Sequence, residues 1–195
     1  YFPADPLFYY FNGISNKWFK NYDAAIKSLE LGSEFVVENQ SLIIEFYSNL
    51  ADAYHTKGEY KLSDEYYEKV LEIDSNNVLV LNNYSYYLSL RRKKLEKAKE
   101  MSFRCNELEP DNGTYQDTYA WILYQLKEYK KAEKWLLKAL SNNGGESAVI
   151  VEHYGDILYK LGKKTEALKA WKKAKELSGS SKFLNKKIEE KKLYE

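Results

Sequence analysis

The chain has 195 residues, which is enough for one compact core or for a short array of repeats. With 30 Lys and Arg residues against 29 Asp and Glu, its formal charge of +1 gives no broad electrostatic reason to bind nucleic acid or an anionic membrane. A hydrophobic fraction of 44% indicates a folded chain, no apolar run is long enough to span a bilayer, and one cysteine excludes an internal disulfide.

The N-terminal stretch, YFPADPLFYYFNG, is unusually aromatic. Asp5 followed by Pro6 is typical of a helix N-cap with proline at the first helical position. One terminal helix cannot bury so many rings, so we expect them to contact another chain or upstream sequence. The residues concerned are Tyr1, Phe2, Phe8, Tyr9, Tyr10 and Phe11. Because the sequence begins without methionine, we expect that a leader or an upstream region precedes it.

Residues 113–140 carry the clearest periodic pattern in the chain. Apolar side chains recur at offsets of three, four and seven on both sides of a break near Lys127 and Glu128, which predicts two helices. Ala120, Ala132 and Ala139 are small residues at positions where the two helices would touch. Such a pair cannot bury both of its faces alone and therefore requires copies of itself.

Copies of this unit are present along the chain. Ala51, Ser85, Ala120 and Gly155 are equivalent small residues that recur every 34 or 35 positions. The same spacing to a following aromatic residue and alanine begins at Gly13. This register predicts five helical repeats over residues 6–43, 44–77, 78–112, 113–147 and 148–179.

The pattern resembles the tetratricopeptide repeat (TPR), whose period is 34 residues. The resemblance implies an all-α, right-handed solenoid of about five helix pairs, forming one array over residues 1–195. Lys164 and Gly32 depart from the usual aromatic residue and alanine, and only Pro110 occupies the terminal proline position. The residues between the consensus positions also resemble those of envelope-associated tandem TPR proteins of bacteria, many of which are lipoproteins. That likeness favours a periplasmic setting at the outer membrane.

Residues 182–194 predict a final helix that caps the array. One side carries Phe183, Leu184 and Ile188, whereas the lysines are expected largely on the opposite, polar side; these are Lys186, Lys187, Lys191 and Lys192. A basic amphipathic tail that binds a membrane surface is the alternative interpretation. Three glutamates interrupt the lysines, which favours the cap.

No constellation of residues points to catalysis, to a metal site or to a cofactor. His55 and His153 lie three repeats apart, so we expect both to pack or to face a binding groove rather than to share a metal. Cys105 stands at a position of close helix contact, which predicts a small buried side chain rather than a reactive thiol. The basic run Arg91–Lys94 is expected in a solvated turn, with a phosphate or acidic partner as the alternative.

The resemblance implies that the first helix of each repeat lines a concave face that binds extended peptides. Tyr and Trp side chains on such a face are typical of interaction hot spots. The lysines and arginine of the familiar clamp for a C-terminal carboxylate are missing from the expected positions, which disfavours a receptor for chaperone tails. The candidate binding residues are Asn49, Asp52, His55, Asn82, Asn83, Tyr86, Asp117, Trp121, Tyr124, Asp156 and Tyr159.

The sequence therefore predicts a non-enzymatic scaffold that binds an extended peptide or a partner protein. Because the candidate face is acidic and aromatic, we expect the partner to be neutral to basic and to carry apolar anchors. A structural unit of a larger bacterial envelope complex, joined by self-association or through its aromatic N-terminal end, is the alternative. An enzyme is the third hypothesis, and no residue pattern supports it.

Overall fold

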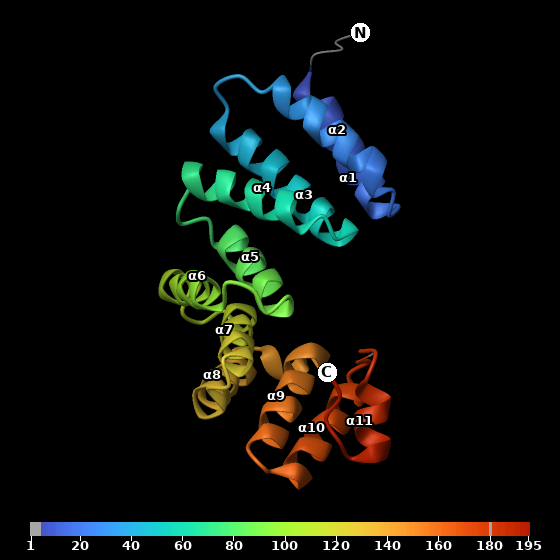
Figure 1. Ribbon diagram of the computed structural model, residues 1–195, viewed down its shortest axis with the longest axis vertical. Helices are drawn as coiled ribbons and strands as arrows, with labels where there is room; N and C mark the ends of the chain where they lie inside the picture. Colours follow the sequence, from blue (N-terminus) through green and yellow to red (C-terminus); the bar gives the residue numbers. More distant parts are fainter. Residues whose placement is uncertain (1–4, 180) are drawn as a thin grey trace. The chain divides into compact units, whose positions relative to one another are not determined.

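The computed structural model describes residues 5–179 and 181–195, which divide into two compact units at residues 80 and 81. In these residues the regular structure consists of α-helices and one short 3-10 turn, with no β-strand (Figure 1). The predicted all-α class is therefore confirmed.

The first unit contains two helix pairs. Helix α1 (Pro6–Trp18) packs on α2 (Tyr22–Glu34), α3 (Gln40–Lys57) packs on α4 (Tyr60–Ile73), and α2 contacts α3. The Asp5 carboxylate accepts a hydrogen bond from the Leu7 amide at 2.9 Å, which confirms the predicted N-cap. Leu29, Phe46 and Leu50 form the centre of the core of this unit.

The second unit begins within α5 (Val78–Leu90) and continues with α6 (Leu95–Leu108). Helix α7 (Gly113–Gln125) packs on α8 (Tyr129–Ser141), and α9 (Ala148–Lys160) packs on α10 (Lys164–Glu176). The 3-10 turn η1 (Gly144–Glu146) connects these pairs, and α11 (Leu184–Glu190) ends the helical order. Each predicted repeat range holds one helix pair, except that α3 already begins at Gln40, before the predicted boundary at residue 44.

Close helix contact explains the small residue of each pair. A Cβ atom added at Gly155 would lie 2.4 Å from the indole ring of Trp171, so a side chain there would displace the core of the last pair. The equivalent Ala51 and Ala120 are fully buried. Gly58 ends α3 with φ of 81°, a left-handed conformation that glycine adopts without steric cost.

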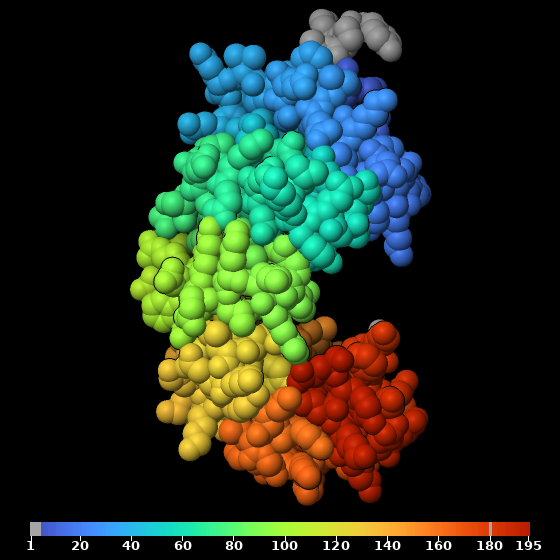
Figure 2. Space-filling model, in the orientation of Figure 1, coloured from blue at the N-terminus to red at the C-terminus, as the bar shows by residue number. Residues whose placement is uncertain are grey.

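Helix α11 caps the second unit as predicted. Leu184 is fully buried against α10, with Ile188 and Leu193 packed beside it. In Figure 2 the red C-terminal segment lies against the orange α9–α10 pair. The predicted orientation of one lysine was wrong, because Lys187 is only 4% exposed and points into the unit rather than toward solvent. Its two carboxylate partners on α9 account for this difference.

Candidate functional site

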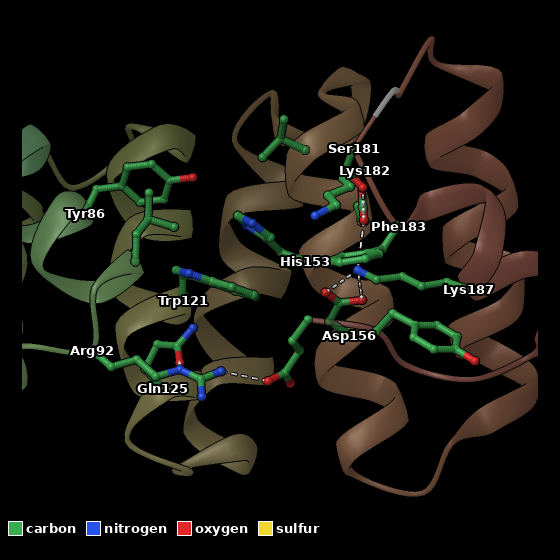
Figure 3. A pocket seen from close by; sticks show the side chains of 15 residues that line it. Tyr86, Arg92, Trp121, Gln125, His153, Asp156, Ser181, Lys182, Phe183 and Lys187 are labelled. Carbon is green, nitrogen blue, oxygen red and sulfur yellow. Dashed lines mark hydrogen bonds and ion pairs between the residues drawn. The ribbon is translucent and has the colours of Figure 1, made fainter. Parts of the chain in front are cut away.

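The second unit contains an open cavity of about 440 Å³. Side chains from α7 and α9, from the C-terminal end of α5 and from residues 181–195 line it (Figure 3). Its apolar wall consists of Tyr86, Leu90, Val149 and Phe183. Since these side chains come from separate repeats and from the C-terminal segment, the cavity depends on the whole of this unit.

A stack of three rings supports one side of the site, and two of them, Trp121 and His153, line the cavity. The Trp121 ring stacks on Tyr124 with centroids 4.7 Å apart and on His153 with centroids 4.1 Å apart. The interplanar angles are 8° and 17°, so the three rings are nearly parallel. The Trp121 Nε1 atom is buried and has no hydrogen-bond partner among the described residues. A buried donor without an acceptor is costly, which marks this N–H as a point where a ligand oxygen would be stabilised.

His153 is fixed from behind by a carboxylate. Its Nδ1 lies 3.0 and 3.1 Å from the two oxygens of Asp117. Burial of the ring opposes protonation, but the negative charges of Asp117, Asp156 and Glu152 outweigh it and raise the pKa of His153 above its usual range. His153 and Asp117 therefore favour a charged pair beneath Trp121.

Two further carboxylates share one lysine of the C-terminal segment. Lys187 Nζ lies 2.8 Å from Glu152 Oε1 and 2.7 Å from Asp156 Oδ2. Asp156 also accepts a hydrogen bond from Trp171 Nε1 at 2.8 Å, and Ser181 donates one to Glu152 at 2.5 Å. The acidic field predicted for this face is therefore largely offset within the chain itself.

A fourth carboxylate, that of Glu195, lies at the far end of the cavity. Arg92 Nη2 lies 2.8 Å from Glu195 Oε2, Lys160 Nζ lies 3.0 Å from Oε1, and the Tyr124 hydroxyl donates a hydrogen bond to Oε1. Arg92 also donates through Nε to Gln125 at 3.0 Å, which holds its guanidinium in place. Partial burial opposes ionisation of Glu195, but these donors outweigh it and lower its pKa.

The candidate residues of the second unit fall into three groups. Tyr86, Trp121 and Asp156 line the cavity together. Asp117 and Tyr124 lie behind that surface, where they hold His153 and Glu195. The remaining three are not among its lining residues: Asn82 and Asn83 lie on α5, and Tyr159 stacks on Trp171 with centroids 5.7 Å apart.

The candidate residues of the first unit form a separate polar cluster on α3. The Asn49 side chain accepts a hydrogen bond from Lys17 Nζ at 2.7 Å and donates one to the Glu45 carbonyl at 2.9 Å. Asp52 accepts a hydrogen bond from the Tyr67 hydroxyl at 2.5 Å, and the His55 ring lies against Tyr60. The Asn49 oxygen, although Asn49 is a candidate binding residue, is thus already bonded within the chain.

Sequence reasoning missed most of the groups that complete the site. Arg92 was expected in a solvated turn, and neither Lys160 nor Glu195 was assigned a role. Their contacts join residues 35 to 103 positions apart, whereas a repeat register describes only equivalent positions in successive units. The one sequence signal available for these groups was a charged residue at the end of the first helix of a repeat, such as Lys160.

Possible metal ligands and the single thiol are the remaining reactive groups of the described residues. No group of three or more His, Cys, Asp or Glu side chains in this part of the chain could hold a metal ion. Cys105 is fully buried as predicted, and burial raises its pKa to about 12, which keeps the thiol protonated.

Comparison with known proteins identifies the architecture. The tetratricopeptide repeat family matches residues 44–77 and 115–144, at two of the helix pairs described above. The chain contains tetratricopeptide repeats, the unit that defines TPR proteins. TPR proteins are non-catalytic interaction scaffolds that bind protein partners, and this chain shares their helical architecture. No helix in the described residues is long and apolar enough to cross a membrane.

The relatives of this TPR protein include one from the type IV pilus system. It is 33% identical over 113 residues to the type IV pilus assembly protein PilF of Pseudomonas aeruginosa, a match that spans 57% of this chain and 44% of that protein. The chain therefore matches less than half the length of this curated relative.

Solved structures agree with the fold. The structure of Pseudomonas aeruginosa PilF matches 96% of this chain and 86% of that chain with a TM-score of 0.75 and 22% identity. The thermophilic TPR protein TTC0263 of Thermus thermophilus matches 95% of this chain and 98% of that chain with a TM-score of 0.73 and 18% identity.

Proposed function

We propose that this TPR protein is a non-enzymatic scaffold whose second unit holds an extended segment of a partner protein. The observation that carries the proposal is the buried, unpartnered indole N–H of Trp121 beside an open cavity. A backbone carbonyl of an extended segment would accept that hydrogen bond. An apolar or aromatic side chain next to it would fill the wall formed by Tyr86, Leu90, Val149 and Phe183.

The ring stack gives this site the properties of an interaction hot spot. Trp and Tyr provide large contact areas with few rotatable bonds, so little conformational entropy is lost on binding. Trp121 is already held between Tyr124 and His153, and His153 is held by Asp117. A partner would therefore meet a surface that needs little rearrangement.

The proposed partner segment is neutral around its apolar anchor. The sequence favoured a neutral to basic partner because Asp117, Glu152 and Asp156 are acidic. In this unit each of these carboxylates has a cationic or titratable partner in Lys187 or His153. Pairing removes most of the attraction for a basic segment, so this cavity supports the neutral half of that expectation.

The proposed setting is the bacterial envelope, on the periplasmic side at the outer membrane. The similarity to a type IV pilus assembly protein supports this setting and suggests that the partner belongs to an assembly machinery of that kind. Anchoring as a lipoprotein is part of the same proposal.

Selection of binders from a displayed library of short random peptides tests the cavity. We expect the selected peptides to carry aromatic or aliphatic anchors, and Trp121→Ala to weaken them by roughly 2 kcal/mol or more, as for a hot spot. Trp18→Ala is the matched control, because Trp18 is 84% exposed and lies in the first unit. Selected peptides that bind equally well to the Trp121→Ala protein would exclude the cavity as the site.

Exposed aromatic residues on α1 favour a second candidate function, assembly into a larger complex. Phe8 is 70% exposed, and Phe11, Trp18 and Phe19 are also exposed. Phe8 stands five residues before the small residue of its repeat. The equivalent residues of α3, α7 and α9 are all buried; they are Phe46, Tyr115 and Ile150.

Helices α3, α7 and α9 each pack against the second helix of the preceding pair. These partners are α2, α6 and α8, respectively. The equivalent face of α1 would therefore accept a helix from another chain or from upstream sequence. Sedimentation at several concentrations tests self-association. A concentration-dependent dimer that the Phe8→Lys, Phe11→Lys double variant abolishes would support assembly, and a monomer at every concentration would exclude self-association through this face.

A further inference from the structure

The Glu195 carboxylate lies in a site built from three successive repeats. Arg92 follows α5, Tyr124 belongs to α7 and Lys160 is the last residue of α9, yet all three donate to this one carboxylate. Two charged donors and one hydroxyl on the same two oxygens are a donor set that recognises a carboxylate.

The donors are held by contacts that do not involve Glu195. The Tyr124 ring is 3% exposed and stacks on Trp121, so its hydroxyl has a fixed direction. Gln125 accepts from Arg92 Nε and leaves the outer nitrogens for the carboxylate. Lys160 Nζ also lies over the Tyr124 ring, 5.8 Å from its centroid. The site therefore keeps its donors if the carboxylate leaves.

Glu195 lies outside the helices, and the contacts of its carboxylate remain partly open to solvent. It follows α11 by several residues, and its side chain stays 30% exposed while it bridges Arg92 and Lys160. Contacts that are partly open to solvent contribute little stability individually. A carboxylate from another molecule could therefore replace that of Glu195 at modest cost.

We propose that Arg92, Tyr124 and Lys160 form a binding site for a peptide carboxylate, which Glu195 occupies within the chain and which an acidic group of a partner takes over. The inference rests on the proposed function, because the carboxylate site adjoins the cavity that contains Trp121. The partner segment then combines an apolar anchor beside Trp121 with an acidic side chain or a terminal carboxylate at Arg92 and Lys160.

Glu195→Ala, in a protein that ends in a short Gly-Ser extension after residue 195, vacates the site and keeps any terminal carboxylate away from it. Three synthetic peptides serve as probes. KKLYE with an amidated end copies residues 191–195 and offers one side-chain carboxylate, KKLYQ with a free end offers one terminal carboxylate, and amidated KKLYQ offers none. Titrations followed through the indole N–H signal of Trp121 in two-dimensional NMR report both affinity and location.

We expect at least one carboxylate peptide to bind the Glu195→Ala protein roughly tenfold more tightly than amidated KKLYQ, because hydrogen bonds to charged groups are the stronger ones. The carboxylate peptide that binds more tightly shows whether the site prefers a side-chain carboxylate or a terminal one. Binding to the protein with Glu195 intact should be weaker. The preference should disappear in the Arg92→Gln, Lys160→Met double variant, whose side chains are partly exposed, and should decrease in Tyr124→Phe, which keeps the ring stack.

Equal binding of all three peptides, each with a shift of the Trp121 signal, would overturn the carboxylate site and leave the proposed cavity intact. A carboxylate preference without any change at Trp121 would support the carboxylate site and contradict the proposed function. If no peptide binds at concentrations up to about 10 mM, the carboxylate site is also overturned. Dissociation constants up to that range are expected when a contact is no longer covalently linked to the chain.

Discussion

The two units contain the same acidic position in two different environments. Asp52 follows the small residue of α3, and Asp156 follows that of α9, so the two are equivalent in register. Each accepts a hydrogen bond from an aromatic residue of the second helix, Tyr67 at 2.5 Å and Trp171 at 2.8 Å. Each also faces a lysine from another helix.

The lysines show where the units differ. Lys17 of α1 lies 3.6 Å from Asp52, and the two side chains are 18% and 30% exposed. Lys187 of α11 lies 2.7 Å from Asp156, and those side chains are 5% and 4% exposed. The helix that carries the lysine, α1 or α11, therefore determines whether the acidic residue at this repeat position forms a partly solvated pair or a buried ion pair. Removal of one partner has very different consequences in the two cases.

Lys187→Met should cause the largest loss of stability. It keeps the apolar stem but leaves Glu152 and Asp156 buried without their cation, which typically costs about 3–5 kcal/mol. Lys17→Met in the first unit should cost at most about 1 kcal/mol, because its pair is partly solvated. Urea unfolding of both variants, followed by the exchange of amide hydrogens in each unit, measures the difference. Equal losses in the two units would show that burial by α11 does not control this pair.

The ring partners of the two carboxylates provide the next comparison. Trp171→Phe removes the donor to Asp156 and leaves a gap beside Gly155, so we expect a loss of about 3 kcal/mol. Tyr67→Phe removes only the hydroxyl that donates to Asp52, where solvent can replace it, and should cost about 1 kcal/mol. Free energies of unfolding of the two variants check the order. A larger loss for Tyr67→Phe would reverse the assigned environments.

These contrasts also explain what the sequence could predict. Helices α1 to α10 follow from the repeat register, because small residues such as Ala120 and Gly155 mark every close contact. Trp121 and Asp156 could be assigned to the first helices of their repeats for the same reason. Lys187 and Glu195 could not, since they come from a terminal segment outside the repeat pattern. That segment reaches Asp156 and Arg92 through tertiary contacts over 31 and 103 residues.

The His153–Asp117 pair predicts a dependence on pH that is confined to the second unit. The folded-state pKa of His153 is raised above its unfolded value of about 6.5, so protonated His153 stabilises the fold. That contribution is fully present below about pH 6.5 and is lost as the pH rises through the raised pKa of the folded state. Unfolding free energies measured across neutral pH should decline with this profile in the unsubstituted protein.

His153→Gln is the control for that profile, because an amide keeps a donor near Asp117 but does not titrate. We expect its decline above neutral pH to be flatter. His55 of the first unit offers the matched comparison, and His55→Gln should leave the profile of the second unit unchanged. An identical pH dependence in His153→Gln would assign the titration to another group.

The smallest expected effect is the one that the two units should share. Gly58 ends α3 with φ of 81°, Gly162 follows α9 with φ of 82°, and a Cβ atom at either position would meet no atom within 4 Å. The cost of Gly→Ala then comes only from the left-handed backbone, about 1 kcal/mol for a residue with a Cβ. Gly58→Ala and Gly162→Ala should therefore reduce the stability of their units equally. Because neither glycine touches the covering helices, a difference above about 0.5 kcal/mol would reveal that the units respond differently even where their local structure is the same.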